Sequence, residues 1–353
     1  MYDSLHDFIP TSIVGTKNND LPPASFKPEF LPIMGNSVLR YANPLLLLKI
    51  RKVMKERQST HLAMEHPYFG WLGILAKWIW GTKLIIRSQN IEALRFKSMG
   101  KPWWRLLWLY ERFTHRMANL NFFITEDDHQ YALTHFKLDP KKCFTITYGF
   151  DLAAPPTPEE KKNAKLQLLQ TYGLPEDSLL LFFNGALDYA PNEEALDMIV
   201  KEINPLLMKQ MDCPYTIIIC GKNLPERFGN LESEKKNNMV YAGFVEDISL
   251  YFKGTDIFIN PVIEGGGIKT KLVEALGNDL SSISTRKGAT GVPEDITGGK
   301  MKMIEDKDWA TFASSIQSGF PQNLHIPETF FSYFYWRNIA EKAYIAILEE
   351  NKS

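Results

Sequence analysis

Residues 257–276 combine an open backbone with two cations and a carboxylate, in a spacing that suits phosphate and sugar binding. Three consecutive glycines, Gly265 to Gly267, leave backbone N–H groups accessible, and a helix beginning just after them adds partial positive charge. Lys269 and Lys271 supply cations, and Glu274 can accept hydrogen bonds from vicinal sugar hydroxyls. The stretch therefore predicts an anion site, with an ordinary glycine-rich turn before a solvated helix as the alternative.

Short apolar runs alternate with amphipathic segments along the whole chain. This alternation predicts parallel sheets with helices on both faces. The expected strands are residues 11–15, 61–65, 83–87, 121–125, 144–147, 179–184, 215–220, 239–243, 257–259 and 281–285. The expected helices are residues 45–56, 68–80, 126–136, 158–172, 193–210, 245–252 and 330–349. Residues 18–32 contain many turn-forming residues and are expected to be irregular.

The length of 353 residues allows two domains, each with its own core. The proline-rich stretch 151–158 separates two α/β patterns and marks the boundary. We therefore expect one domain in residues 1–150, a second in residues 151–330 and a terminal helix in residues 331–353. The formal net charge of −1 gives no overall electrostatic case for nucleic-acid binding.

The cysteines and the N-terminus indicate a reducing compartment. Cys143, Cys213 and Cys220 are widely spaced and form no CxxC motif, so neither a disulfide framework nor a zinc site is predicted. The N-terminus lacks the basic and apolar regions of a signal peptide, and no apolar run is long enough to span a bilayer. A cytoplasmic location is expected.

The segment Lys83–Arg116 is rich in cations and aromatic residues, including Trp103, Trp104 and Trp108. A basic aromatic helix of this kind can lie on an anionic membrane surface. Alternatively, an amphipathic helix packs its tryptophans into the core of the domain. The sequence leaves both interpretations open.

Several motifs together resemble one enzyme family. From Leu180 onward the chain reads FFNGALDYAPNEEAL, TIIICGKN, YAGFVEDISLYFKGTDIFINPVIEGGGIKTKLVEALG and ISTRKGATGV. This order resembles the C-terminal half of retaining glycosyltransferases of the GT-B fold, specifically family 4. EHPYFGWLG, RSQNIEALRF, FFITEDDHQYA and TYGFD are similar to the acceptor side of that family. The resemblance implies an α/β fold of two Rossmann-like domains with parallel sheets facing a central cleft, and a C-terminal helix that returns to the N-terminal domain.

The resemblance also implies roles for individual residues. Glu274 matches the glutamate that holds the ribose of the donor nucleotide, while Gly266, Gly267 and Ile268 match backbone that holds the diphosphate or faces the donor sugar. Lys269 and Lys271 stand at cationic positions. The residues expected on loops around the nucleotide are Gly185, Asp188, Lys222 and Phe244.

This chain departs from the family pattern at several positions. Gly266 replaces a glutamate that meets the donor sugar in many relatives. The loop 185–192 lacks the usual Arg and Lys, so neutralisation of the diphosphate rests on Lys269, Lys271 or Arg286. Gln89-Asn90 replaces a strand-end His-Asn pair, and glutamine cannot act as a general base. The catalytic candidates are therefore Gln89, Asn90 and His66. The family's usual first strand with its glycine-rich loop is not visible before Ser12.

The resemblance implies transfer of a hexose from a nucleotide diphosphate sugar to a hydroxyl, with retention, in surface polysaccharide or glycolipid assembly. The expected partners are the nucleotide sugar and a glycan or lipid-linked acceptor, with peripheral contact at the inner face of the membrane. No metal or other cofactor is expected, and acidic residues 126–128 are read as partners of a helix dipole. Two alternatives are a sugar-nucleotide epimerase, with His66, Glu65 and Glu92 as acid/base candidates, and a non-catalytic sugar-nucleotide or glycan-binding protein.

Overall fold

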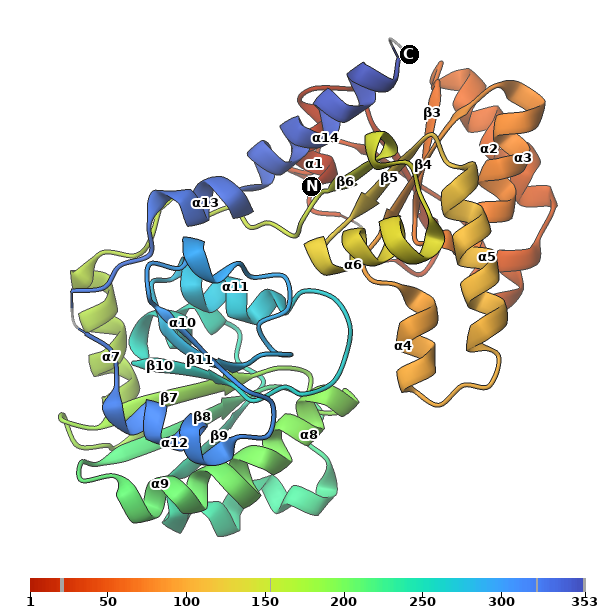
Figure 1. Cartoon of the computed structure of the whole chain (residues 1–353). Coiled ribbons are helices and arrows are strands. Elements are labelled where there is room, and N and C mark those ends of the chain that lie inside the picture. The colour runs from red at the N-terminus through yellow and green to blue at the C-terminus, as the bar shows by residue number, and fades with distance from the viewer. Residues whose placement is uncertain (20–21, 153, 322, 352–353) are drawn as a thin grey trace. The chain divides into compact units, whose positions relative to one another are not determined.

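The computed structural model describes residues 1–19, 22–152, 154–321 and 323–351. It contains two compact units, one formed by Met1–Gly149 with Phe334–Ser353 and the other by Phe150–Tyr333 (Figure 1). Ala153, in the stretch expected to link two domains, lies outside the described residues. Among the described residues, no helix has the length and apolar character needed to cross a bilayer.

The first unit contains a four-stranded parallel sheet in the order β3-β4-β5-β6. Its strands are β3 (His61–Glu65), β4 (Lys83–Ser88), β5 (Leu120–Phe123) and β6 (Cys143–Thr145). All four run in the same direction, so their carboxyl ends lie at one edge, where side chains that follow the strands can meet.

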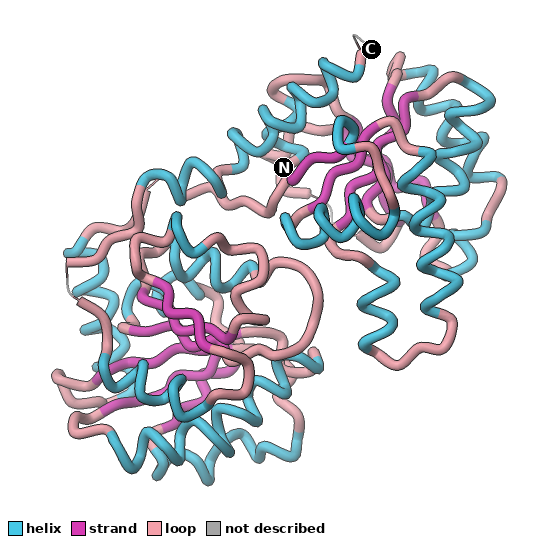
Figure 2. The backbone as a smooth tube through the Cα atoms, viewed as in Figure 1, coloured by secondary structure: helices cyan, strands magenta, loops and turns pink. Residues whose placement is uncertain are grey.

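Helices cover both faces of this sheet, as Figure 2 shows. Helices α2 (Leu45–Glu56) and α3 (Gly70–Trp80) pack on the face that carries Leu84 and Ile86. Helix α14 (Trp336–Glu350) packs on the opposite face, against Ile85 and Phe122. The C-terminal helix therefore belongs to the core of the first unit, as the resemblance implies. The other helices of the unit are α1 (Tyr2–His6), α4 (Glu92–Ser98), α5 (Trp104–Met117) and α6 (Glu126–Tyr131).

Three expectations for the first unit and the chain's end are corrected. Residues 18–32 are not wholly irregular, because β2 (Glu29–Met34) pairs in parallel with β1 (Ser12–Thr16) in a separate two-stranded sheet. The basic segment forms two helices, α4 and α5, separated by a turn containing Gly100 and Pro102. The terminal helix is interrupted at Tyr335, which separates α13 (Glu328–Phe334) from α14.

The second unit contains a six-stranded parallel sheet in the order β12-β11-β10-β7-β8-β9. Its strands are β7 (Leu179–Asn184), β8 (Tyr215–Cys220), β9 (Met239–Gly243), β10 (Ile257–Asn260), β11 (Ser281–Thr285) and β12 (Met301–Ile304). The predicted class of parallel α/β sheets is confirmed. Two elements were missed, β12 and helix α12 (Trp309–Ser318).

Helices of the second unit are fixed by local signals and by core packing. Helix α7 (Pro158–Tyr172) begins with a capping box between Thr157 and Glu160 and ends at Gly173 in the left-handed conformation. One continuous helical segment is formed by α8 (Ala190–Met198), a π-helical turn (Ile199–Ile203) and α9 (Asn204–Gln210). The remaining helices are α10 (Ile248–Gly254) and α11 (Thr270–Gly277).

Candidate functional site

The six-stranded sheet reverses its strand order between β7 and β10, and we call this position the switch point. Successive strands lie on one side of β7, through β8 to β9, whereas β10, β11 and β12 extend to the other side. The segments that follow β7 and β10 therefore leave in opposite directions, and ligands of open parallel sheets bind outside the strand ends at such a point. The predicted phosphate-binding stretch follows β10, and the loop containing Gly185 and Asp188 follows β7.

The glycine loop between β10 and α11 has a conformation that favours glycine. Gly265 has φ 91° and Gly267 has φ 68°. A Cβ atom on Gly265 would lie 3.3 Å from both Lys269 Nζ and Pro191 Cγ, so a larger residue would crowd the loop. The ammonium of Lys269 donates to the carbonyls of Gly266 at 3.1 Å and Gly267 at 3.4 Å. Ile268 is half-buried beside them.

Lys271 joins the two sides of the switch point. Its ammonium donates to the carbonyl of Asn184 at 3.2 Å and to Asn192 Oδ1 at 2.9 Å, and lies 4.4 Å from the centre of the Phe183 ring. Burial, together with the neighbouring charge of Lys269, lowers the pKa of Lys271 to about 7. Among the described residues no carboxylate forms an ion pair with it. Lys271 is therefore held in place by these hydrogen bonds and is not a mobile surface cation. A bound anion would stabilise its charged form.

Glu274 lies one helical turn after Lys271 on α11. It is half-buried between the buried residues Val273 and Ala275, and its carbonyl accepts a hydrogen bond from Asn278 Nδ2 at 2.9 Å. Residues 270 and 274 share one side of the helix, so Glu274 stands on the side of α11 that begins at the glycine loop. Ribose binding by its carboxylate stays a prediction.

The loops after β7, β8 and β9 are linked through their backbones. Gly185 N–H donates to the Cys220 carbonyl at 3.1 Å, and Gly221 N–H donates to the Gly243 carbonyl at 2.8 Å. A Cβ atom at Gly221 would overlap the carbonyl oxygen of Gly185. Gly221, Asn184 and Asn192 were not among the predicted site residues. The glycine immediately after a buried strand was the available signal for Gly221.

The other nucleotide-side candidates have different surroundings. Asp188 is exposed and accepts from Asn223 Nδ2 at 2.9 Å. The exposed Lys222 contributes its carbonyl, which accepts from Leu187 N–H at 3.0 Å, and Phe244 is 72% exposed after β9. Arg286 is engaged by Glu305, to which its Nε donates at 3.0 Å. Of the three cations expected to neutralise a diphosphate, Lys269 and Lys271 are therefore the ones beside the glycine loop.

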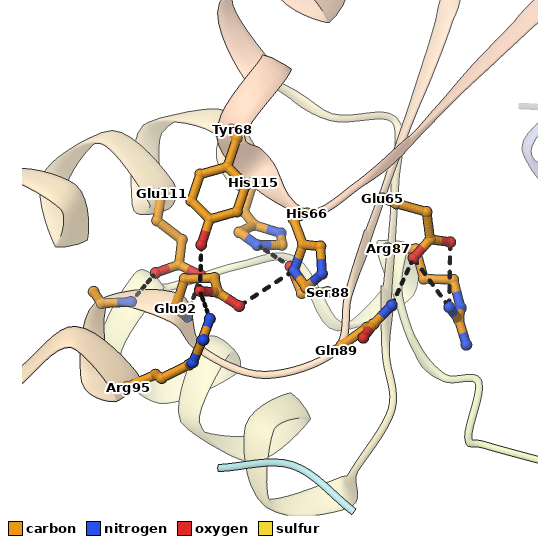
Figure 3. Close-up of polar contacts among 11 residues, drawn as sticks. Glu65, His66, Tyr68, Arg87, Ser88, Gln89, Glu92, Arg95, Glu111 and His115 are labelled. Carbon is orange, nitrogen blue, oxygen red and sulfur yellow. Dashed lines mark hydrogen bonds and ion pairs between the residues drawn. The ribbon is translucent and has the colours of Figure 1, made fainter. Parts of the chain in front are cut away.

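The carboxyl edge of the first unit's sheet carries two groups of polar side chains (Figure 3). One group surrounds Glu65, which accepts from Arg87 Nη1 at 3.1 Å, from Gln89 Nε2 at 3.3 Å and from the hydroxyl of Tyr2. Gln89, one of the three catalytic candidates, is thus engaged by a carboxylate on the side of the strands away from His66. Asn90, the second candidate, is half-buried, and its Oδ1 atom is shielded without a hydrogen-bond partner among the described residues.

The second group surrounds Glu92, the first residue of α4. Only 1% of Glu92 is exposed, and one carboxylate oxygen accepts from the Tyr68 hydroxyl and from Arg95 Nη1 at 3.1 Å. The other oxygen lies 3.3 Å from Nδ1 of His66, the third catalytic candidate. Burial raises the pKa of the Tyr68 hydroxyl, which therefore stays protonated as a donor. Figure 3 shows the His66 ring and the Glu92 carboxylate facing each other.

Two further buried groups hold this arrangement from behind. Glu111 of α5 accepts from the backbone N–H groups of Glu92 and Ala93, both at 3.0 Å, and so caps the start of α4. Burial raises the pKa of Glu111 to about 8 against the effect of these donors. His115 lies between Ser88 and Asn121, with contacts of 3.1 and 2.8 Å, and burial lowers its pKa to about 4. His115 is therefore a neutral core histidine.

The acidic residues at the start of α6 follow a threonine cap and contact neighbouring groups. Thr125 is the N-cap, and its hydroxyl accepts from Asp128 N–H at 3.1 Å, while Glu126 accepts from Thr145 Oγ1 at 2.7 Å. Across the part of the chain that the structure describes, no three His, Cys, Asp or Glu side chains are grouped as metal ligands.

Part of the second unit is similar to a known protein family. Residues 178–319 match the family model described as glycosyl transferases group 1. An uncharacterised 44.6 kDa protein from the cps region of Klebsiella pneumoniae is 26% identical over 185 residues, which cover 48% of this chain and 45% of that protein. The chain thus spans less than half the length of this curated relative.

Solved structures show the same arrangement of elements. Sucrose-phosphate synthase from Thermosynechococcus elongatus has a TM-score of 0.68 at 12% identity, covering 99% of this chain and 92% of that one. WaaG, a glycosyltransferase involved in lipopolysaccharide biosynthesis, has a TM-score of 0.61 at 14% identity, covering 92% and 88%. Anabaena HepE in complex with UDP has a TM-score of 0.60 at 15% identity, covering 93% and 85%. Residues 178–319 of the second unit are therefore similar to glycosyl transferases group 1, and the chain has the GT-B fold.

Proposed function

We propose that the protein transfers a sugar from a nucleoside diphosphate sugar to a hydroxyl of a glycan or lipid-linked acceptor, with retention at the anomeric carbon. The observation that carries the proposal is the position of Lys271, which is fixed where the six-stranded sheet reverses its order and has no carboxylate counter-ion within the described part of the chain. The similarity to glycosyl transferases group 1 and the complex of HepE with UDP support the same class of donor. The cps and lipopolysaccharide context of two relatives supports surface polysaccharide or glycolipid assembly.

The chemistry follows from the charge of the leaving group. Cleavage of the bond between sugar and diphosphate places negative charge on phosphate oxygens. Backbone N–H groups of Gly266, Gly267 and Ile268, the N-terminus of α11 and the ammonium groups of Lys269 and Lys271 would stabilise that charge. These groups supply the positive charge that the leaving diphosphate needs, so the proposal requires no metal or other cofactor.

Glu274 is proposed to hold the ribose hydroxyls of the donor. Replacement by alanine removes a charged acceptor, and we expect nucleotide-sugar binding to weaken by about 2 kcal/mol, or roughly 30-fold. Calorimetric titration of Glu274→Ala with the donor measures this loss, and Glu159→Ala, an exposed carboxylate on α7, is the control for charge. Equal affinity of Glu274→Ala and the parent protein would remove Glu274 from the site.

A donor screen tests the reaction class. Thermal shift assays against a panel of nucleoside diphosphates identify the base, because a ligand at 100 times its Kd adds about 2.7 kcal/mol of stability. The matching sugar nucleotides are then incubated with and without acceptor, and products are identified by mass spectrometry. Nucleotide release only with acceptor supports transfer. Interconversion of the sugar supports an epimerase, and binding without turnover supports a non-catalytic partner.

Membrane contact is proposed through the exposed stripe of α5. Its apolar residues are spaced by three or four positions and are 44% to 71% exposed: Trp103, Leu106, Leu109 and Phe113. Arg105 and Arg116 are exposed on the same helix. Trp108, by contrast, packs against Phe136 and donates to the Tyr131 hydroxyl at 3.0 Å. The two interpretations of this segment therefore apply to different tryptophans, and the exposed set favours the inner, anionic face of a cytoplasmic membrane.

Vesicle sedimentation tests this contact. We expect binding to vesicles that contain anionic lipid, weaker binding to zwitterionic vesicles, and loss of binding in Leu106→Glu. Leu166→Glu, on exposed α7 of the other unit, is the matched control. Equal sedimentation of the parent protein and Leu106→Glu would exclude this surface.

A further inference from the structure

Asn192 connects the first turn of α8 to the buried cation of α11. We propose that Asn192 positions Lys271 for the donor diphosphate: its neutral amide oxygen holds the ammonium at the switch point and leaves the counter-charge to the ligand. This inference rests on the proposed function, which it deepens by coupling donor binding to the uptake of a proton. Asn192 acts through Lys271 and is therefore a positioning residue.

Three hydrogen bonds fix Asn192. Its backbone N–H donates to the Tyr189 carbonyl at 2.8 Å, in the first turn of α8. Its Nδ2 atom donates to the Ala186 carbonyl at 3.0 Å, and its Oδ1 atom accepts from Lys271 Nζ at 2.9 Å. Exchange of the two amide atoms would place an NH₂ group against an ammonium group, and both of these groups are donors only. The network therefore directs the amide oxygen at Lys271.

The loop after β7 leaves room for this amide because residue 185 is glycine. A Cβ atom on Gly185 would lie 2.5 Å from Asn192 Nδ2, closer than real Cβ atoms approach other atoms. The same glycine donates its N–H to the Cys220 carbonyl at 3.1 Å, which ties the loop to the end of β8. A larger residue at position 185 would therefore displace the amide that holds Lys271.

The hydrogen-bond acceptors of Lys271 are neutral groups. They are the Asn192 amide oxygen and the Asn184 carbonyl, at 2.9 and 3.2 Å from the ammonium, and the centre of the Phe183 ring lies 4.4 Å away. Neutral oxygens stabilise an ammonium less than a carboxylate does. Burial, together with the charge of Lys269, therefore lowers the pKa of Lys271 to about 7 despite these contacts.

Titratable groups lie on all the segments around this ammonium. They are Asp188 and Tyr189 after β7, Glu193 and Glu194 on α8, Glu264 and Lys269 in the glycine loop, and Glu274 on α11. Glu193 accepts from Arg227 Nε at 2.9 Å, and Asp188 accepts from Asn223 Nδ2 at 2.9 Å. The charge that acts on the buried ammonium is that of Lys269. An arriving anion would supply the compensating negative charge.

An amide at residue 192 suits an anionic ligand better than the alternatives of similar size. A carboxylate there would pair with Lys271 and would repel phosphate oxygens. An apolar side chain would leave a donor of a buried ammonium without an acceptor. The Asn192 amide avoids both, because it accepts a hydrogen bond from Lys271 without cancelling its charge.

Proton uptake on donor binding follows from this arrangement. A diphosphate beside Lys271 favours the charged form of its side chain, so the protein takes up a proton from solvent on binding and returns it when the diphosphate leaves. A group with a pKa of about 7 is roughly one-tenth protonated at pH 8. At pH 8 the uptake should therefore approach one proton for each ligand bound.

The first test is the pKa of Lys271 in the ligand-free full chain, measured from the chemical shifts of its ¹⁵Nζ and ¹³Cε atoms. Asn192→Asp keeps the size of the side chain and adds a carboxylate, so this pKa should rise by roughly 1–3 pH units. Asn192→Leu keeps the size and removes the acceptor, so the pKa should fall below that of the parent protein. Asn163→Asp, on the exposed face of α7, adds the same charge elsewhere and is the control.

Opposite shifts in the two Asn192 variants distinguish positioning from a structural role. Circular dichroism establishes that each variant is folded. A structural side chain would give no reason for the pKa of Lys271 to move in opposite directions. A pKa that moves in the same direction in both variants, or in neither, therefore overturns the positioning role.

The second test is calorimetric titration with the nucleoside diphosphate that most stabilises the parent protein. Titration at pH 8 in two buffers of different ionisation enthalpy gives the number of protons taken up. We expect the parent protein and Asn163→Asp to take up close to one proton. Asn192→Asp should take up almost none, because Lys271 is already charged, and should bind at least about tenfold more weakly, because its charge is neutralised.

The outcomes separate this inference from the proposed function. Parent-like proton uptake and affinity in Asn192→Asp would remove Asn192 from donor binding and leave the class of donor intact. Failure of every nucleoside diphosphate to bind the parent protein would overturn the proposed function. In that case the pKa of Lys271 in the two variants would still decide whether Asn192 sets its charge.

Discussion

Replacement of His66 by glycine and by alanine measures the backbone strain at the sheet edge. Both variants lose the imidazole and its contact with Glu92, so the difference between them isolates the effect of a Cβ atom at φ 67°. That conformation costs a non-glycine residue of order 1–3 kcal/mol, whereas glycine loses about 0.4–1 kcal/mol through its more flexible unfolded state. We therefore expect His66→Gly to be more stable than His66→Ala by about 1 kcal/mol.

Urea denaturation followed by tryptophan fluorescence is the assay. Seven of the eight tryptophans belong to the first unit, so the signal reports the unit that contains His66. The control pair is Lys52→Gly and Lys52→Ala, on the exposed face of α2, where alanine should be the more stable by about 1 kcal/mol. The same order at both positions, with alanine more stable, would show that His66 is unstrained.

Two further predictions concern buried charges in the second unit. Because the pKa of Lys271 is about 7, we expect nucleoside diphosphate affinity, measured by calorimetry, to fall by up to about tenfold per pH unit between pH 7.5 and 9, and Lys271→Arg to remove this dependence. If the affinity does not change over that pH range, Lys271 does not bind the anion. Burial alone would raise the pKa of Asp279, but the Ile326 N–H and Lys300 together lower it further than burial raises it. The ionised Asp279 therefore stabilises the folded protein at pH values above the ordinary carboxyl range, and this stabilisation is lost as the pH falls through the native pKa. We expect Asp279→Asn to lose about 3 kcal/mol of unfolding free energy at pH 7 and to converge with the parent protein only as the pH falls below the ordinary carboxyl range, as followed by circular dichroism, and a loss that stays constant with pH would contradict this.

Buried central strands were the elements best predicted from sequence. The bounds of β7 and β8 agree with the expected residues. Their side chains are almost wholly apolar, so each strand is a continuous apolar run and no alternation of apolar and polar residues has to be recognised. Strand β2 was missed because Pro32 lies inside it, and proline ordinarily argues against a strand unless the strand is at an edge. The two-stranded sheet provides such an edge. The break between α4 and α5 had a visible signal in Gly100 and Pro102 that the charge pattern obscured.

The candidate site was predictable where it is local and not where it depends on distant residues. The glycine loop and α11 are consecutive, so their arrangement followed from a single stretch. The position of the Lys271 ammonium depends on Asn192, 79 residues away, and on Phe183, whose ring centre lies 4.4 Å from it. Sequence reasoning therefore described a pair of mobile cations, whereas the structure distinguishes Lys271, fixed across the switch point, from Lys269, which binds its own loop.

The parallel register of the first unit bears on the substitution at Gln89. Glu65 pairs with Arg87 in the ladder between β3 and β4, so His66 and Gln89 leave the same sheet edge from neighbouring strands. A proton acceptor can move from one strand end to the next and still serve a ligand bound at that edge, because neighbouring strands lie only about 4.8 Å apart. Loss of an imidazole at residue 89 therefore does not by itself argue for a non-catalytic protein. The adjacent strand end carries the imidazole of His66, whose Nδ1 atom lies 3.3 Å from the carboxylate of the buried Glu92.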